Sequence, residues 1–410
     1  MNYKITIKDG KEKQLLRHHP WVFSGAIKSI EPKFDIASWA DVYTEKGTFI
    51  AKGWYDEKSH IVLHLLSWDE KEKVGLAFVK RLAREAVMRR RSFFRKGATT
   101  NAFRLIHGEA DSLPGFAVDV YASTIRIILS SRFASAFLQA VVEELDSLLH
   151  PSLIVVSSDP QYTSVEGMSS KTRYFISDEE KKMAEDKIEP VTILENGIYY
   201  EIPGTKGQKS GFYIDQRDNR LIAEGYAEGR TCLDVCSYTG AFTLHLLKGG
   251  AESVKAIDSS ESALRHLLYQ VHLNEDKGAI PSGSREKVEI LSGDCFELLR
   301  TEEKDKYDLI VLDPPKLAKT KGSLENAMKA YKDLNRVAME KIKDGGILIT
   351  FSCSGALSRE DFKTVLSWSA KDAEVEAQIL RTLSQGEDHP VRLSFPESEY
   401  LKGYVLRILK

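Results

Sequence analysis

The sequence predicts an α/β protein whose C-terminal part is a doubly wound, mainly parallel sheet, preceded by a small β-barrel and a central α+β domain. From about residue 191 onward, short apolar runs alternate with turn and helix patterns, as in parallel sheets connected by helices. Residues 1–72 hold short β-rich runs separated by Gly and Asp, which is typical of a small barrel. Residues 73–186 combine a basic helical pattern with strand patterns, which indicates an α+β fold.

Composition restricts the class of protein further. The chain has 410 residues, of which 42% are hydrophobic and 29% charged, so we expect a globular protein of two or three domains. We place the domains at 1–72, 73–186 and 187–410, with the charged run SDEEKKMAEDKIEP (177–190) as a linker. The polar start MNYKITIKDGKEK resembles no secretory signal, and no apolar run is long enough for a membrane span, so we expect a cytoplasmic protein.

The four cysteines are spaced in a way that disfavours both disulfides and metal. They form no CxxC pair and have no His at ligand spacing, so we expect reduced thiols and no metal site. Cys232 lies in a predicted strand and should be part of the core. A chemical role is therefore open for the other cysteines.

One segment is strongly basic although the net charge of the chain is only −2. Between Lys80 and Lys96, eight Lys or Arg residues face the single acid Glu85, and Phe93 and Phe94 lie among them. A solvated helix face would explain the charge. The alternative is a helix that contacts RNA phosphates while its rings stack on bases, and for that role we select Arg89, Arg90 and Arg91.

Five apolar runs are predicted to be buried parallel strands, and each ends near a small, acidic or thiol residue. The runs are CLDVCS, SVKAID, VEILSGD, DLIVLD and GILITF. Ligands of doubly wound sheets bind beyond the carboxyl ends of the strands. The side chains expected at that edge are Asp234, Asp258, Asp294, Asp313 and Cys353. Any one of these acids could instead cap the following helix.

The spacing of the acids suggests a nucleoside cofactor. Asp258 follows Asp234 by about 24 residues, a separation suited to binding ribose hydroxyls, and Asp294 could accept from an adenine amino group. Cys236 and Tyr238 stand where a dinucleotide-binding turn needs glycines, so a pyrophosphate is disfavoured. S-adenosylmethionine, which has no phosphate, fits better. LDPPK (312–316) is the kind of strand-end motif that borders a methyl-transfer site, although a rigid turn alone would also explain its prolines.

Several motifs, in order along the chain, resemble the bacterial large-subunit 23S ribosomal RNA (cytosine-5)-methyltransferase family. They are GQKSGFYIDQRDNR (207–220), LDVCSYTGAF, LDPPK, YKDLN (331–335), GGILITFSCSG, DHPV (388–391) and YLKGY (400–404). EKQLLRHHPWVFSGAI (12–27) resembles that family's RNA-binding PUA domain, and RLIHGEADSLPGFAVD (104–119) its central domain. The resemblance implies a Rossmann-like class I S-adenosylmethionine-dependent methyltransferase domain and 23S ribosomal RNA as partner.

The resemblance also implies site residues. The implied cofactor contacts are Asp215, Gln216, Arg217, Asp234, Cys236, Tyr238, Gly240, Asp258, Ser259, Asp294, Cys295 and Asp313. Cys353 takes the position of the nucleophile, Asp313 borders the transfer site, and Lys316 lies beside it toward the RNA. Ser112 and Leu317 depart from the family pattern, which has glycine and commonly an aromatic at these positions.

A thiol suits this chemistry, because carbon-5 of cytosine becomes nucleophilic only after a thiolate has added to carbon-6. Cys295 is the alternative thiol, although its position after Asp294 favours a cofactor-pocket wall. Two other functions stay open: a nitrogen-directed RNA methyltransferase, which needs no thiol, and a non-catalytic RNA-binding assembly factor. The modified nucleotide, the base that removes the carbon-5 proton and a possible homodimer are not decided by the sequence.

Overall fold

The computed structural model describes residues 2–32, 36–95, 97–181, 189–203, 212–317, 322 and 324–410. Residues 207–211 of the GQKSGFYIDQRDNR motif, Lys96 and residues 182–188 of the predicted linker lie outside this range. The chain forms two compact units. The first contains Met1–Ile193, Ile202–Ile214 and Asp388–Ser398, and the second contains Leu194–Glu201, Asp215–Glu387 and Glu399–Lys410.

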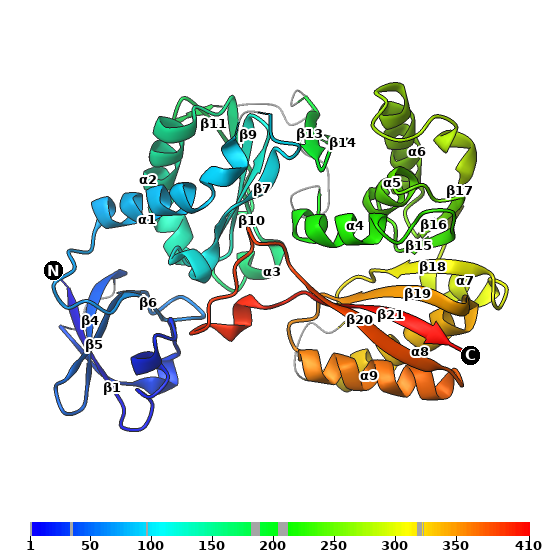
Figure 1. Cartoon of the computed structure of the whole chain (residues 1–410). Coiled ribbons are helices and arrows are strands. Elements are labelled where there is room, and N and C mark those ends of the chain that lie inside the picture. Colours follow the sequence, from blue (N-terminus) through cyan, green and yellow to red (C-terminus); the bar gives the residue numbers. More distant parts are fainter. Residues whose placement is uncertain are drawn as a thin grey trace. The chain divides into compact units, whose positions relative to one another are not determined.

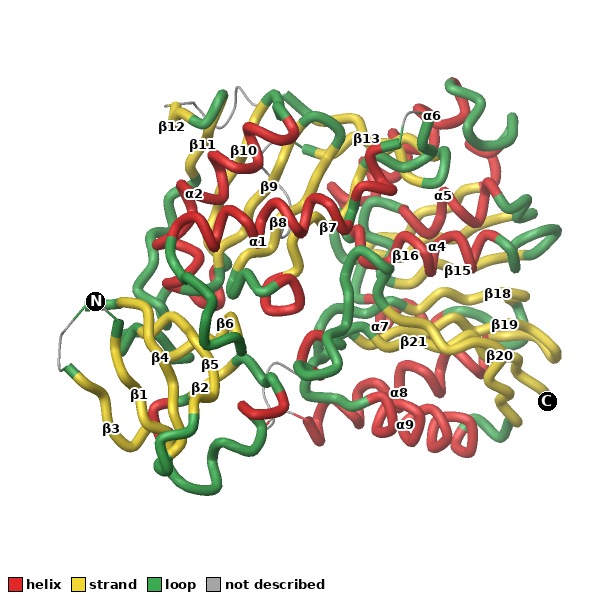
Figure 2. Tube along the Cα trace, turned by 60° about the vertical axis from the view of Figure 1, so that its left-hand side comes forward, coloured by secondary structure: helices red, strands yellow, loops and turns green. Residues whose placement is uncertain are grey.

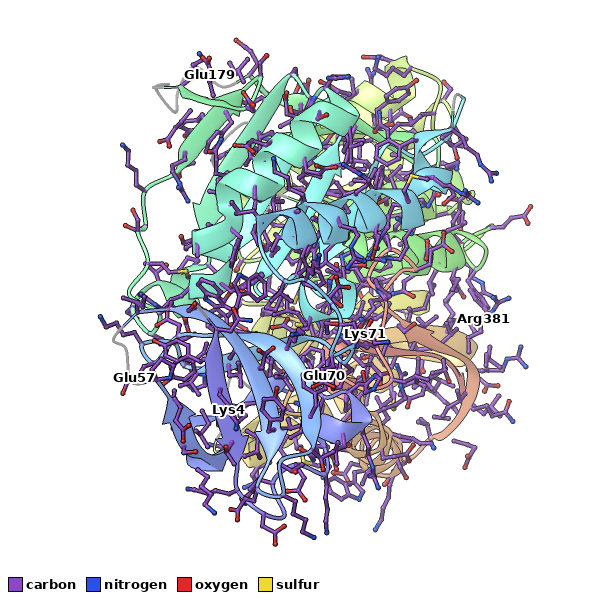
Figure 3. The ribbon with its side chains drawn as sticks, turned by 90° about the vertical axis from the view of Figure 1, so that its left-hand side faces the viewer. Lys4, Glu57, Glu70, Lys71, Glu179 and Arg381 are labelled. Carbon is purple, nitrogen blue, oxygen red and sulfur yellow. The ribbon has the colours of Figure 1, made fainter. Side chains whose placement is uncertain are left out.

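The N-terminal part of the first unit is a six-stranded sheet with the order β2-β6-β5-β4-β1-β3. Its strands are β1 (Tyr3–Ile7), β2 (Trp21–Val22), β3 (Ile27–Glu31), β4 (Ser38–Thr44), β5 (Phe49–Tyr55) and β6 (Leu63–Ser67). Alternate residues of β1 are buried in a separate apolar core, which is the period of two expected of a strand with one covered face. Exposed charges of both signs, Lys4, Glu57, Glu70 and Lys71, lie on this part of the chain (Figure 3).

A second six-stranded sheet follows, with the order β12-β11-β10-β9-β8-β7. Its strands are β7 (Ala102–His107), β8 (Phe116–Tyr121), β9 (Thr124–Leu129), β10 (Leu153–Ser158), β11 (Arg173–Ile176) and β12 (Glu179–Lys181). Helices α1 (Leu76–Arg89) and α2 (Arg132–Leu149) bury their apolar sides against one face of it (Figure 2), and α3 (Pro160–Thr163) is short. The start of the predicted linker is thus a strand, because Glu179–Lys181 pair with β11.

Residues 388–398 belong to the first unit because Asp388 is buried among basic groups of that unit. Arg90 donates to both carboxylate oxygens of Asp111 at 2.7 Å and to the carbonyl of Asp388 at 3.0 Å. The backbone amide of Arg104 donates to the Asp388 carboxylate at 2.7 Å. The DHPV motif therefore contributes to the packing of the first unit, not to the sheet of the second.

The second unit contains a seven-stranded sheet with the order β17-β16-β15-β18-β19-β21-β20. Its strands are β15 (Thr231–Val235), β16 (Ser253–Asp258), β17 (Val288–Ser292), β18 (Tyr307–Leu312), β19 (Ile342–Ser352), β20 (Glu376–Ser384) and β21 (Lys402–Leu409). β15–β19 pair in parallel, whereas β21 pairs antiparallel with β19 and β20. This confirms the predicted doubly wound sheet. The expectation of burial is wrong for β17, which is an edge strand without a fully buried residue.

Helices cover both faces of this sheet. They are α4 (Arg217–Glu224), α5 (Ala241–Lys248), α6 (Glu261–Asp276), α7 (Cys295–Thr301), α8 (Leu324–Lys341) and α9 (Arg359–Asp372). α8 and α9 lie side by side on one face, and α5 and α6 lie on the other (Figure 1). A two-stranded sheet of β13 (Val191–Glu195) and β14 (Ile198–Ile202) precedes α4. Because β15, β16, β18 and β19 are parallel, their carboxyl ends share one edge.

Candidate functional site

The turn after β15 presents buried polar atoms that have no hydrogen-bond partner in the described part of the chain. One carboxylate oxygen of Asp234 accepts from the amide and hydroxyl of Thr243, at 3.0 and 2.7 Å, and so ties β15 to α5. The other Asp234 oxygen and the Ser237 hydroxyl are buried without a partner among the described residues. Burial raises the pKa of Asp234 to about 7. Because unpaired buried polar atoms are costly, this turn suits a polar ligand.

The same turn has a strained backbone. Cys236 and Tyr238 adopt positive φ angles of 63° and 49°, and Gly240 has a φ of 81°. A Cβ at Gly240 would lie 2.3 Å from Cγ of Leu267 on α6. Gly240, predicted as a cofactor contact, is therefore required by the turn and by the packing of α5 on α6.

Asp258 ends β16, and backbone amides hold its carboxylate. One oxygen accepts from the amide of Tyr238 at 2.9 Å, and the other accepts from the amide of Ser260 at 2.8 Å. A carboxylate that accepts one bond at each oxygen keeps lone pairs for further donors. The predicted ribose acceptor and the turn after β15 are thereby brought together, and the neighbouring Ser259 is exposed.

Asp294 and Cys295 lie at the start of α7. One Asp294 oxygen accepts from the amides of Phe296 and Glu297, so Asp294 caps this helix, the alternative that the sequence left open. Cys295 is buried. The Cys236 and Cys295 thiols are hydrogen-bonded to each other, and this bond together with burial raises the pKa of Cys236 well above its usual value. Cys295 thus packs against the turn after β15.

Asp313, directly after β18, is linked to the predicted 215–217 segment. Gln216 Nε2 donates to Asp313 at 3.0 Å, and the Tyr400 hydroxyl donates to Asp215 at 2.7 Å. Burial, reinforced by the negative charge of Asp215, raises the pKa of Asp313 to about 7. The Arg217 guanidinium, in contrast, pairs with the adjacent carboxylate of Asp218 at 2.9 Å.

Cys353 follows β19 at the same sheet edge and is half-buried. The serines on either side of it are fully buried, and the hydroxyls of Ser354 and Tyr331 are hydrogen-bonded at 3.1 Å. Lys402 Nζ donates to the carbonyl of Ser354 at 2.8 Å. The YKDLN and YLKGY motifs thus support the strand end that carries the thiol. The sequence pattern alone predicted no role for Tyr331 or Lys402.

A buried ion pair whose charge acts on Asp234 and Asp313 was not predictable from the sequence. Arg220 donates to both carboxylate oxygens of Glu195, at 2.7 and 2.8 Å, and both side chains are buried. The positive charge of Arg220 lowers the pKa of Asp234 and of Asp313, and so opposes the effect of burial on these two carboxyl groups. The DNR letters of the IDQRDNR motif contain this residue, but only the fold pairs it with a residue outside the motif.

The basic segment of the first unit is less available than its sequence suggests. Arg90 is 4% exposed and is held by Asp111, so the prediction that it contacts phosphate is corrected. Other basic residues of α1 meet acids from elsewhere in the chain: Lys80 pairs with Glu143, Arg81 with Glu72, and Arg84 with Glu144. Arg89 is exposed, although it also reaches Asp111.

The end of the basic segment differs from α1. Arg91 and Arg95 are exposed, and neither has an ion-pair partner in the described part of the chain. A pocket of about 220 Å³ lies there, lined among others by Phe93, Phe94 and Arg95. Phe94 is 42% exposed and packs edge-on against Phe103.

The described residues form neither a metal cluster nor a membrane-spanning helix. No group of three or more His, Cys, Asp or Glu in the described ranges could hold a metal ion. No described helix combines the length and the apolar character needed to cross a membrane.

Lys316, the predicted RNA contact beside Asp313, is exposed.

Comparisons with known proteins agree with this geometry. A family described as a PUA-like domain matches residues 5–68, and an S-adenosylmethionine-dependent methyltransferase family matches residues 103–390. Proteins named ribosomal RNA large subunit methyltransferase I, from Pseudoalteromonas atlantica and Escherichia coli, are 36% and 34% identical to this chain. Each match covers 100% of this chain and 100% of the relative.

Solved structures share the fold. One described as a methyltransferase complexed with SAH has a TM-score of 0.81 and 20% identity, and the match covers 99% of this chain and 100% of that chain. Another, described as a SAM-dependent methyltransferase from Streptococcus mutans, has a TM-score of 0.79 and 19% identity, with the same coverage. The chain therefore belongs to the S-adenosylmethionine-dependent methyltransferase family, in the group that contains the ribosomal RNA large subunit methyltransferases I.

Proposed function

We propose that the chain methylates carbon-5 of a cytosine in 23S ribosomal RNA and that Cys353 is the nucleophile. The observation that carries the proposal is the full-length similarity to ribosomal RNA large subunit methyltransferases I. It is supported by the position of Cys353 beyond β19, at the sheet edge where Asp258 and Asp313 also end their strands. A nucleophile, a ribose acceptor and a titratable carboxyl group then share one edge.

The cofactor, S-adenosylmethionine, supplies an electrophilic methyl group when it is bound. Asp258 would hold the ribose, because its carboxylate is oriented by two backbone amides. The unpaired oxygens of Asp234 and Ser237 would meet polar groups of the same ligand. Asp294 keeps one oxygen that is not used in capping α7, and we assign it to the adenine amino group.

Cys353 acts on the pyrimidine ring. Its thiolate adds to carbon-6, and the bond that forms pushes electrons toward carbon-5, which becomes nucleophilic. After carbon-5 has bonded to the methyl group supplied by the cofactor, its proton passes to a base or to water, and elimination of the thiolate restores the aromatic ring and the free nucleophile. Asp313 in its protonated form would donate to nitrogen-3, because a carboxyl group with a pKa of about 7 still carries its proton in part of the molecules at neutral pH.

We assign the RNA contact of the first unit to the end of the basic segment. Arg91 and Arg95 supply unpaired positive charge, and Phe94 beside the pocket supplies an exposed ring on which a base can stack. Arg89 and Lys316 are exposed as well and stay in the proposed set. A cytoplasmic location and a homodimer stay predictions, to be tested by cell fractionation and light scattering.

The test uses RNA that contains 5-fluorocytosine. Fluorine replaces the proton that leaves carbon-5, so elimination stalls and a protein–RNA adduct should survive denaturing electrophoresis. Cys353→Ser should form no adduct and should not methylate carbon-5, whereas the control Cys295→Ser should do both. Full activity of Cys353→Ser would reject the covalent mechanism and favour nitrogen methylation.

Two further measurements address the remaining questions. Bisulfite sequencing of ribosomal RNA from a deletion strain identifies the modified nucleotide. Absence of SAH binding to the protein would favour the assembly-factor function.

A further inference from the structure

We propose that Lys402 is a positioning residue whose ammonium group keeps the Cys353 side chain in its thiolate form. This inference rests on the proposed function, because it gives the nucleophile its charge. It adds a residue for which neither the motif analysis nor the comparisons supply a role. Three observations carry it: strand register, the hydrogen bond of the ammonium group, and the absence of a carboxylate partner among the described residues.

The register brings Lys402 to the end of the nucleophile strand. Lys402 is the first residue of β21 and lies directly opposite Ser352, the last residue of β19. The two strands are closely packed here, because a Cβ at the next residue, Gly403, would lie 2.5 Å from the ring of Phe351. The backbone of Lys402 is therefore held opposite Ser352, the residue that directly precedes Cys353.

The side chain of Lys402 extends along the same strand end. It begins opposite Ser352, and its Nζ donates to the carbonyl oxygen of Ser354 at 2.8 Å. Cys353 is the residue between these two points. The side chain of Lys402 is 3% exposed, so solvent screens its charge only weakly.

A buried ammonium group normally pairs with a carboxylate, because leaving a charge unpaired in the interior is costly. No carboxylate lies within ion-pair distance of Lys402 Nζ in the described ranges. Glu399 is an acid whose charge acts on Lys402, but its carboxylate is bound by Arg359 at 2.6 Å. The position of a counter-anion is therefore open, and the Cys353 thiolate can fill it.

The effects of neighbouring charges on the pKa of Lys402 agree with this role. Burial lowers the pKa of Lys402 to about 8, and the positive charges of Arg359 and Lys316 add to this decrease. Glu399 and the Cys353 thiolate act in the opposite direction. The interaction between the two groups is mutual. If a thiolate at Cys353 raises the pKa of Lys402, the ammonium group of Lys402 lowers the pKa of the Cys353 thiol by the same amount. The proton of that thiol is released to water.

The test measures the thiol directly and needs neither RNA nor cofactor. Iodoacetamide alkylation of Cys353, quantified by peptide mass, gives the pH at which half of the thiol has ionised. In Lys402→Gln the amide can still donate to the Ser354 carbonyl but carries no charge. We expect its midpoint to rise by about 1–3 pH units, so that alkylation at pH 7 slows about tenfold or more. Lys402→Arg should restore most of the reactivity.

Two controls make the result decisive. Lys343→Gln removes a charge from the other end of β19 and should leave the Cys353 midpoint unchanged. SAH binding measured by calorimetry checks that each variant is folded, and Lys402→Met serves if Lys402→Gln does not fold. A midpoint in both uncharged variants equal to that of the parent would overturn the inference. If instead Cys353→Ser retains methylation, the proposed function fails while the alkylation result stands.

Discussion

At the scale of single residues, Asp258 offers the most direct test of the cofactor site. Its two oxygens are oriented by the amides of Tyr238 and Ser260, and each keeps a lone pair for a ribose hydroxyl. We predict that Asp258→Ala loses about 1–3 kcal/mol of SAH binding, roughly 5–150-fold in affinity by calorimetry. Glu261→Ala, an exposed acid at the start of α6, is the matched control. Unchanged affinity in folded Asp258→Ala would contradict the assignment.

The carboxyl group of Asp313 gives a prediction about pH. Its pKa is raised from 3.8 to about 7 in the folded protein, mainly by burial. Between these values the folded state retains a proton that the unfolded chain has lost, so the stability contributed by Asp313 is complete below about pH 4 and is lost as the pH rises to about 7. Asp313→Asn cannot ionise, so its melting temperature should rise relative to the parent across that range and then stay level. Thermal unfolding between about pH 4 and pH 8 measures this.

An exposed acid supplies the comparison for that pH series. Glu303 is exposed and follows α7, so Glu303→Gln should change the melting temperature by nearly the same amount at every pH. A difference between Asp313→Asn and the parent that is equally independent of pH would mean that Asp313 ionises in the folded protein as it does in the unfolded chain.

At the scale of elements, the packing of α5 on α6 depends on one glycine. Gly240 has a positive φ, and an added Cβ would collide with Leu267. Gly240→Ala should therefore cost about 1–2 kcal/mol for the backbone conformation and about 1–3 kcal/mol for overpacking. Gly278→Ala has a similar φ of +67° but open space around it, so it should incur only the backbone cost. Urea unfolding measures both, and equal losses in the two variants would contradict the steric argument.

The elements of the second unit were predictable because their signals are local. Each parallel strand is a short apolar run that ends at a turn, and the order of acids along the chain placed Asp258 and Asp313 at one edge. Contacts between distant segments were not predictable. Nothing in the sequence pairs Lys402 with the end of β19, and no local signal buries Arg90 against Asp111, because these pairings exist only after the sheets have formed. The edge position of β17 is likewise a property of strand order.

At the scale of the whole molecule, charge is distributed differently from what the sequence suggests. The basic residues of α1 that face acids from other segments contribute little net field, because paired charges cancel at a distance. Within the basic segment, the arginines without an ion-pair partner among the described residues lie after α1, at Arg91 and Arg95. The surface of the N-terminal sheet carries both signs of charge. Its contribution to RNA binding should then depend on shape more than on charge density.

This distribution leads to a prediction about salt. Each phosphate contact contributes roughly 0.7–0.9 to the slope of log affinity against log salt. The double variant Arg91→Ala/Arg95→Ala should therefore flatten the slope for ribosomal RNA by up to about 1.8. Arg81→Ala/Arg84→Ala removes the same number of charges from α1, but these are paired with glutamates, so its slope should stay close to that of the parent. Filter binding between about 50 and 200 mM salt measures both slopes. If the α1 pair flattened the slope as much as the other pair, the ion pairs would have to open on RNA binding, and the whole basic segment would again be the contact surface.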